Sequence, residues 1–282
     1  MTMTILITGA TGTVSSAVLD ALPGKDGVRV LVRDPAKAPT GYEVAVGDLD
    51  DPATLTDAFD GVETLWLLTA MGPQAPHASM NAVWAARQAG VRHVVRMSAI
   101  GAAHDAPTRN GRLHALSDTE LQASGLGWTV IRPAFFMQNL FGSVSGDTLY
   151  GGTGQGRLGL IDVRDIGEFA ATVLTDPRPH TGKVYTLTGP ASISLGEAAE
   201  QLAEVYGRSI AYHSLEPEQA YAGMKEAGVP EWIAAVTAEY LRAYAKGWGD
   251  YTTKDYASVT GKQPTPFADF ARAHANQLLG QA

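Results

Sequence analysis

The sequence contains no cysteine among its 282 residues. Disulfides, thiol chemistry and thiolate metal sites are therefore excluded, and nothing in the sequence requires an oxidising compartment. Basic residues are also scarce, because 21 lysines and arginines stand against 29 aspartates and glutamates and the net charge is −8. A protein that binds nucleic acid needs a basic face, so the sequence predicts no nucleic-acid partner.

Long apolar runs and clustered histidines are missing as well. No apolar run approaches the ~20 residues of a membrane span, and residues 1–4 carry no basic residue, unlike a signal or transit peptide. The seven histidines include no pair at i, i+4 spacing, which argues against a metal site. We expect a cytoplasmic protein, monomeric or homodimeric, without a metal or a membrane partner.

The nearest approach to a basic cluster is formed by Arg87, Arg92, His93 and Arg96, which straddle a predicted helix end and a predicted buried strand. Charge runs of this kind usually mark a solvated surface. We therefore interpret this one as a solvated helix end.

The composition, 45% hydrophobic and 18% charged, suits a globular enzyme. Short β-branched runs alternate with helical stretches, as in successive βαβ units of a parallel sheet. The expected strands are 4–8, 28–32, 43–46, 64–68, 94–97 and 129–131, and the expected helices are 14–22, 52–59, 78–89 and 113–123. This pattern predicts an α/β protein with a Rossmann-like, doubly wound parallel sheet.

The expected organisation has two parts. Residues 1–133 are predicted to form the dinucleotide-binding, Rossmann-like portion, and residues 134–282 a mixed segment that completes the sheet and forms a smaller C-terminal substrate lobe. The expected elements of the second part are a strand at 184–188 and helices at 163–174, 195–206, 231–244 and 267–279. Open α/β sheets bind ligands at the carboxyl ends of their strands, where this lobe is expected.

A glycine-rich loop, Gly9-Ala10-Thr11-Gly12, follows the first strand and precedes a helix. That context is typical of dinucleotide binding: the first glycine permits the turn, the second lets backbone approach the pyrophosphate, and the helix N-terminus favours an anion. Ser15 stands where a third glycine is usual, a mild departure because serine is small. The residues expected at the cofactor phosphates are Gly9, Thr11, Gly12, Thr13 and Val14.

Arg33 follows the second strand, where a cation would bind a 2′-phosphate and an acid would bind the ribose hydroxyl. NADPH is therefore favoured over NADH, which stays possible because Asp34 is the next residue; Lys37 adds a cation or is a surface lysine. Asp48 and Leu49 follow the third strand and are candidates for contact with the adenine. The alternative for Asp48 is an Asx-type turn with Asp50.

Several motifs together resemble the NmrA-like branch of the atypical short-chain dehydrogenases/reductases, closest to the NADPH-quinone oxidoreductase and triphenylmethane reductase type. They are Ile7-Thr-Gly-Ala-Thr-Gly12, Val32-Arg-Asp-Pro35, Gly47-Asp-Leu49, Ser117-Asp-Thr-Glu-Leu121, Ser124-Gly125, Arg132-Pro133, Ile161-Asp-Val-Arg-Asp-Ile166 and Leu187-Thr-Gly-Pro190. The resemblance covers nearly the whole chain.

The wider superfamily carries Tyr-x-x-x-Lys, and alignment places Asn110 and His114 at these two positions. The usual acid is absent, so an unactivated ketone is a poor substrate, whereas a quinone or cationic dye gives a delocalised or neutral product. The resemblance implies that His114 binds the nicotinamide ribose or relays a proton; a helix-surface histidine is the alternative. Ser98 stands where the superfamily places a substrate-facing hydroxyl, and a Ser98–His114–Asp118 hydrolytic triad is disfavoured because no Gly-x-Ser-x-Gly motif surrounds Ser98.

The resemblance also implies an aromatic-lined pocket for a flat substrate, although ordinary core packing is an alternative for each residue. The implied residues are Thr69, placed beside the cofactor, and Ala70, Met71, Phe135, Phe136, Met137 and Asn139. The sequence thus predicts an NAD(P)H-dependent oxidoreductase that transfers hydride to a quinone-like or conjugated aromatic acceptor. The alternatives are a non-catalytic NADP-sensing regulatory protein of NmrA type and a non-redox lyase or isomerase.

Overall fold

The computed structural model describes residues 4–280, so the prediction drawn from the first three residues lies outside the described part of the chain. The chain forms two compact units. The first contains residues 4–106, 110–132 and 166–185, and the second contains 107–109, 133–165 and 186–280. The chain thus leaves the first unit after Arg132, one residue before the predicted boundary, and residues 166–185 return to it.

The first unit is built on a seven-stranded sheet in the order β3-β2-β1-β4-β5-β6-β10. Its strands are β1 (Ile5–Ile7), β2 (Val28–Val32), β3 (Glu43–Val46), β4 (Thr64–Leu67), β5 (His93–Met97), β6 (Gly127–Pro133) and β10 (Lys183–Leu187). Strands β1 to β6 pair in parallel. This order is that of the doubly wound Rossmann fold, and it confirms the predicted fold class.

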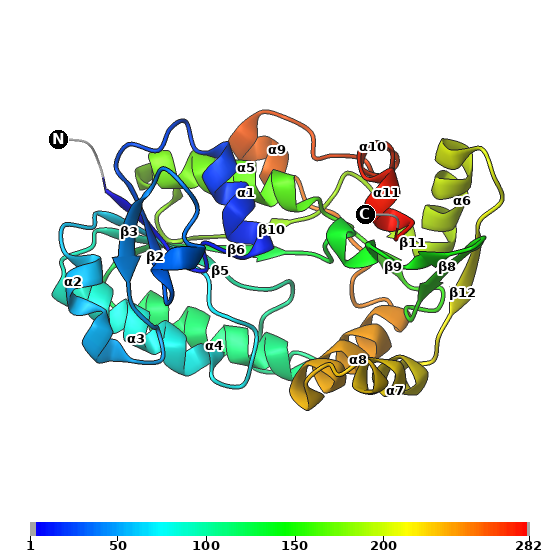
Figure 1. Ribbon diagram of the computed structural model, residues 1–282, viewed down its shortest axis with the longest axis horizontal. Coiled ribbons are helices and arrows are strands. Elements are labelled where there is room, and N and C mark those ends of the chain that lie inside the picture. The colour runs from blue at the N-terminus through cyan, green and yellow to red at the C-terminus, as the bar shows by residue number, and fades with distance from the viewer. Residues whose placement is uncertain (1–3, 281–282) are drawn as a thin grey trace. The chain divides into compact units, whose positions relative to one another are not determined.

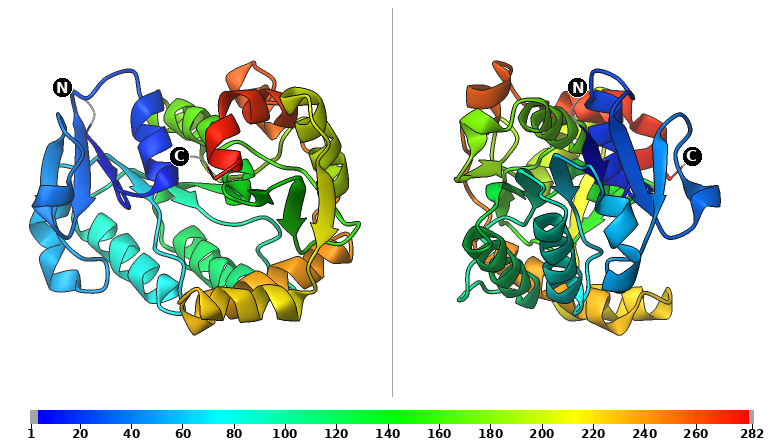
Figure 2. Two further views of the ribbon diagram at one scale, coloured as in Figure 1. Left: turned by 45° about the vertical axis from the view of Figure 1, so that its right-hand side comes forward. Right: turned by 90° about the vertical axis from the view of Figure 1, so that its left-hand side faces the viewer.

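Helices cover both faces of this sheet, which explains why its central strands are buried throughout (Figures 1 and 2). Helices α3 and α4 lie on one face and α1 and α5 on the other. Their bounds are α1 (Thr13–Ala21), α3 (Ala75–Gln88), α4 (Arg109–Ala123) and α5 (Val163–Thr175), and the short α2 (Thr56–Phe59) precedes β4. Gly167 lets α5 approach α1 closely, since a Cβ there would lie 2.4 Å from the Ala17 carbonyl oxygen.

The second unit holds two small sheets, β7-β8-β12 and β9-β11, and most of the later helices. Its elements are β7 (Val144–Ser145), β8 (Thr148–Gly151), β9 (Arg157–Leu158), β11 (Ile193–Ser194), β12 (Ala211–Ser214), α6 (Leu195–Tyr206), α7 (Pro217–Glu226), α8 (Glu231–Ala245), α9 (Asp255–Thr260), α10 (Phe267–Ala273) and α11 (Ala275–Leu278). Its hydrophobic core includes Met137, Leu149, Leu202 and Phe270.

The prediction of one helix over 267–279 is wrong, because the helix is interrupted at His274. That residue has φ −125° and ψ 28°, outside the helical region, and its imidazole bonds the Gln277 side chain at 2.7 Å. No helix within residues 4–280 is long and apolar enough to cross a membrane.

Candidate dinucleotide and active site

The loop between β1 and α1 adopts a backbone geometry that requires glycine. Gly9 has a φ of +63°, and the Gly12 amide donates to the Gly9 carbonyl at 2.8 Å to close the turn. A Cβ at Gly9 would lie 3.0 Å from Leu68 Cδ2, and one at Gly12 would lie 3.2 Å from the Gly9 carbonyl oxygen. Helix α1 then begins at Thr13 with no side-chain cap on its first turn, so backbone amides are presented at this end.

Ser15 performs a specific role at the position where a third glycine was expected. It is fully buried, donates its hydroxyl to the Thr8 carbonyl at 2.9 Å, and accepts from Trp66 Nε1 at 2.9 Å. The side chain therefore ties the first turn of α1 to β1 and β4.

A cavity of about 440 Å³ opens beside this loop, within the first unit. Its lining comes from the carboxyl ends of four parallel strands, namely residues 8–11 after β1, 31–34 at the end of β2, 47–50 after β3, and 68 and 70–75 after β4. The strand order reverses between β1 and β4, and open α/β sheets bind ligands at such a switch point. Gly9 and Thr11 line the cavity, whereas Gly12, Thr13 and Val14 lie beyond its lining.

The part of this cavity next to β2 carries two exposed cations, Arg33 and Lys37. Among residues 4–280, Arg33 makes no ion pair or hydrogen bond. The neighbouring carboxylate is engaged, because Asp34 Oδ1 accepts from the Ala36 amide at 3.0 Å and caps a short 3-10 turn. The side chain of Arg33 is thus available to an anionic ligand group, which favours it over Asp34 as the specificity residue.

Asp48 forms the Asx-type turn that is the alternative to a contact with the adenine. Its Oδ1 accepts from the Asp50 amide at 3.1 Å, and its carbonyl accepts from the Asp51 amide at 3.0 Å. Asp48 and Leu49 nevertheless line the cavity, so a contact with the adenine stays a prediction.

The predicted substrate residues fall in both units. Ala70 and Met71 line the cavity of the first unit, and Met71 is 47% exposed; Thr69 is half-buried and not part of that lining. Phe135, Phe136, Met137 and Asn139 belong to the second unit. Met137 is 1% exposed in the core of that unit, which favours the core-packing alternative for this residue, while Phe135 packs edge-on against Tyr244.

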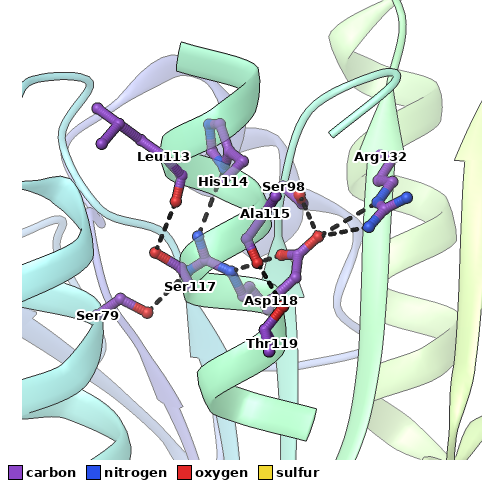
Figure 3. A network of polar contacts seen from close by, with 10 residues as sticks. Ser79, Ser98, Leu113, His114, Ala115, Ser117, Asp118, Thr119 and Arg132 are labelled. Carbon is purple, nitrogen blue, oxygen red and sulfur yellow. Dashed lines mark hydrogen bonds and ion pairs between the residues drawn. The ribbon is translucent and has the colours of Figure 1, made fainter. Parts of the chain in front are cut away.

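A network of charged side chains connects the carboxyl ends of β5 and β6 with α4 (Figure 3). The Asp118 carboxylate accepts from Arg96 Nε at 3.0 Å, Ser98 Oγ at 2.8 Å and Arg132 Nη2 at 2.9 Å. Arg96 also donates to Ser79 Oγ at 3.0 Å. Arg96 and Asp118 are 1% and 2% exposed, so these buried charges are paired and hydrogen-bonded, as the protein interior requires.

His114 adjoins this network through Nδ1, which lies 3.4 Å from Arg96 Nη2. Burial, followed by the positive charges of Arg96 and Arg132, lowers the pKa of His114 to about 3. The imidazole is therefore neutral at physiological pH, which favours hydrogen bonding over proton relay as its role.

The hydrolytic triad is not formed. The Ser98 hydroxyl donates to Asp118 rather than to His114, and His114 Nδ1 faces a guanidinium. Ser98 is also 4% exposed, so its hydroxyl is committed to the network.

The basic cluster expected at a solvated helix end divides into two pairs. Arg87 and Arg92 are exposed as predicted, but the prediction is wrong for His93 and Arg96, which are 4% and 1% exposed. Burial lowers the pKa of His93 to about 4, and its Nε2 bonds Thr129 Oγ1 at 2.9 Å. The signal that sequence reasoning missed is an arginine inside a central apolar strand, which requires a buried acidic partner.

Comparison with known proteins shows the family to which the chain belongs. The family described as NAD(P)H-binding matches residues 9–177. The NAD(P)H azoreductase of Xenophilus azovorans is 37% identical over 283 residues, covering 96% of this chain and 98% of that protein. Two solved structures each cover 96% of this chain and 99% of their own: the triphenylmethane reductase of Citrobacter sp. complexed with NADP(H), at a TM-score of 0.87 and 26% identity, and the NADPH-dependent quinone oxidoreductase of Escherichia coli complexed with NADPH, at 0.86 and 27%.

Proposed function

Because the chain belongs to the NAD(P)H-binding family, as an NmrA-like atypical short-chain dehydrogenase/reductase, we propose that it transfers hydride from NADPH to a conjugated aromatic acceptor. The acceptor class is a quinone, an azo compound or a cationic aromatic dye. Proteins similar over nearly the whole chain are named for reduction of such compounds, which supports this class over a regulatory role without turnover.

The observation that carries the proposal is the cavity at the strand switch point. The glycine loop forms one part of its lining, and Arg33, which has no ion pair among residues 4–280, forms another. Gly9 and Gly12 would leave room for the pyrophosphate, and the uncapped backbone amides at the start of α1 would hold it. Arg33 and Lys37 supply the positive charge for a 2′-phosphate. When bound, NADPH supplies the hydride.

The protein's own residues favour an acceptor whose reduced product is stable without an immediate proton. Asn110 stands at the position of the superfamily tyrosine and is 4% exposed, His114 is neutral, and Ser98 is committed to Asp118. None of the three is an acid of the strength of a tyrosine activated by lysine. The charge of a hydroquinone anion is delocalised and a reduced cationic dye is neutral, so neither product needs an immediate proton from the protein.

The test is the anaerobic oxidation of NADPH and of NADH with benzoquinone, an azo dye, a cationic triphenylmethane dye and cyclohexanone. We expect turnover with the conjugated acceptors, faster with NADPH, and none with cyclohexanone. Tight binding of NADPH without turnover on any acceptor would overturn the reductase proposal in favour of a sensor. Turnover of cyclohexanone at a comparable rate would overturn the acceptor class.

A further inference from the structure

Arg96 lies between an acidic residue and the histidine of the proposed active site. Its Nε donates to Asp118, its Nη1 to Ser79, and its Nη2 faces His114 Nδ1 at 3.4 Å. These contacts fix the plane of the guanidinium, because the side chain is 1% exposed and three of its nitrogens have separate partners. The Nη2 atom is thus held against one particular nitrogen of the imidazole.

An arginine in this place dictates the tautomer of the histidine. A guanidinium has only donors and stays protonated, so the nitrogen that faces it must be the acceptor of a neutral imidazole. Nδ1 of His114 therefore carries no proton, and the proton is on Nε2. Among residues 4–280, Nε2 has no hydrogen-bond partner and is not sealed from solvent, so its N–H is available to a ligand.

The surrounding charges act in the same direction. Arg96 from β5 and Arg132 from β6 oppose a positive charge on His114, and Asp118 from its own helix is the one carboxylate that favours it. Asp118 is shared between both arginines, so it offsets one positive charge of two. The imidazole is kept neutral and can donate through Nε2.

We propose that Arg96, held by Asp118, is a positioning residue that fixes His114 as the Nε2–H tautomer, so that this N–H donates to an oxygen of the bound ligand. This inference rests on the proposed function. The oxygen belongs either to the nicotinamide ribose or to the hydride acceptor. Both oxygens accept hydrogen bonds in the same way. They are distinguished by whether the Kd of NADPH or the kcat changes in the variant described below.

The experiment is a long-range ¹H–¹⁵N correlation spectrum of the imidazoles in histidine-labelled protein, with His114 assigned by its loss in His114→Gln. We expect the pattern of a pure Nε2–H tautomer that persists as the pH is lowered from neutral to about 5, below the ordinary histidine pKa. A mixture of tautomers in the wild-type protein, or titration near 6.5, would overturn the proposal. This readout needs no acceptor and no turnover, so it is independent of the proposed function.

The variant Arg96→Met should produce both tautomers and a His114 that titrates in the ordinary range. The matched control is Arg132→Met, which removes the other arginine on Asp118 without touching Nδ1, and it should retain the Nε2–H tautomer. If the ligand oxygen is on the ribose, Arg96→Met raises the Kd of NADPH; if it is on the acceptor, kcat falls at an unchanged Kd. An unaltered tautomer in a folded Arg96→Met protein contradicts the inference, and if that variant does not fold, the wild-type spectrum decides.

Discussion

At the scale of single residues, Arg33 is the residue that we propose distinguishes the two nicotinamide cofactors. Arg33 is exposed on the cavity lining. Oδ1 of its acidic neighbour Asp34 accepts a hydrogen bond from the Ala36 backbone amide. A guanidinium that binds a phosphate contributes a charge-assisted hydrogen bond.

Arg33→Ala is expected to raise the Kd of NADPH about 10- to 100-fold, the equivalent of one to two such interactions, and to change the Kd of NADH little. Isothermal titration of both cofactors measures this. The matched control is Arg178→Ala, which removes an arginine with a 93% exposed side chain outside the cavity. Equal losses for NADPH and NADH would remove the phosphate role of Arg33.

Ser15 provides a second prediction at this scale. Ser15→Ala leaves the buried Trp66 indole without an acceptor, which should lower the free energy of unfolding by about 1–3 kcal/mol. Denaturant unfolding measures the loss, and Ser16→Ala on the same helix should stay within about 0.5 kcal/mol of wild type. Equal stability of the two variants would show that the indole finds another partner.

The individual residues were predictable where the signal is local. Gly9, Arg33 and Asp48 lie just after strands, and parallel strands bring their carboxyl ends together. Arg96 was not identified, because its environment depends on Asp118, 22 residues later, and on a second arginine in another strand. A charge inside an apolar strand signals a buried partner without saying which residue it is.

At the scale of elements, the turn between β1 and α1 depends on a backbone conformation that only glycine adopts easily. Gly9→Ala should destabilise the fold by about 1–2 kcal/mol for its positive φ. Contact with Leu68 should also distort the loop and raise the Kd of NADPH by about tenfold or more.

Gly125→Ala is the control for this change. Gly125 also has a positive φ, of 81°, but a Cβ there meets nothing within 4 Å. Stability should fall by a similar amount while the Kd of NADPH stays constant. Thermal unfolding and cofactor titration of both variants separate the two effects, and loss of NADPH affinity in Gly125→Ala would mean that general destabilisation explains the Gly9 result.

The central strands of the first unit were predicted well because they are buried on both faces and read as largely apolar runs bounded by turns. The second unit was predicted less completely. Helix α7 has no fully buried residue, only a half-buried stripe of Pro217, Ala220, Tyr221 and Met224, and the strands β7, β9 and β11 have two residues each, too few to show a period. The break at His274 depends on a local hydrogen bond that periodicity does not report.

At the scale of the whole molecule, the buried histidines couple stability to pH. His93 and His114 have pKa values lowered to about 4 and about 3 in the fold, whereas an unfolded histidine titrates near 6.5. As the pH falls below that value, the unfolded chain binds protons that the fold does not, so stability is lost by about 1.4 kcal/mol per pH unit for each histidine. Asp165 has the opposite effect on stability. Burial raises its pKa to about 6, so below that pH the folded protein binds a proton that the unfolded chain does not yet bind.

We therefore expect these three groups together to lower the free energy of unfolding by about 1.4 kcal/mol per pH unit between pH ~6 and ~4, the net effect of one proton. Urea unfolding at several pH values measures the slope. A double variant, His93→Gln with His114→Gln, should instead gain about 1.4 kcal/mol per pH unit on acidification, and Asp165→Asn should lose about 2.8 kcal/mol per pH unit. A slope unchanged by the double variant would mean that both histidines are protonated in the fold.

The hydrogen bond between Ser15 and Trp66, which connects α1 to β4, has a spectroscopic consequence. Trp66 is fully buried, whereas the other four tryptophans are partly or largely exposed, and its indole N–H is bonded to the residue that anchors the glycine loop. Its fluorescence should therefore be emitted at shorter wavelength than theirs and respond to the environment of the loop. Titration with oxidised cofactor would then report loop rearrangement alone, and titration with reduced cofactor would add energy transfer to the dihydronicotinamide. The protein carries its own optical probe of which redox form is bound.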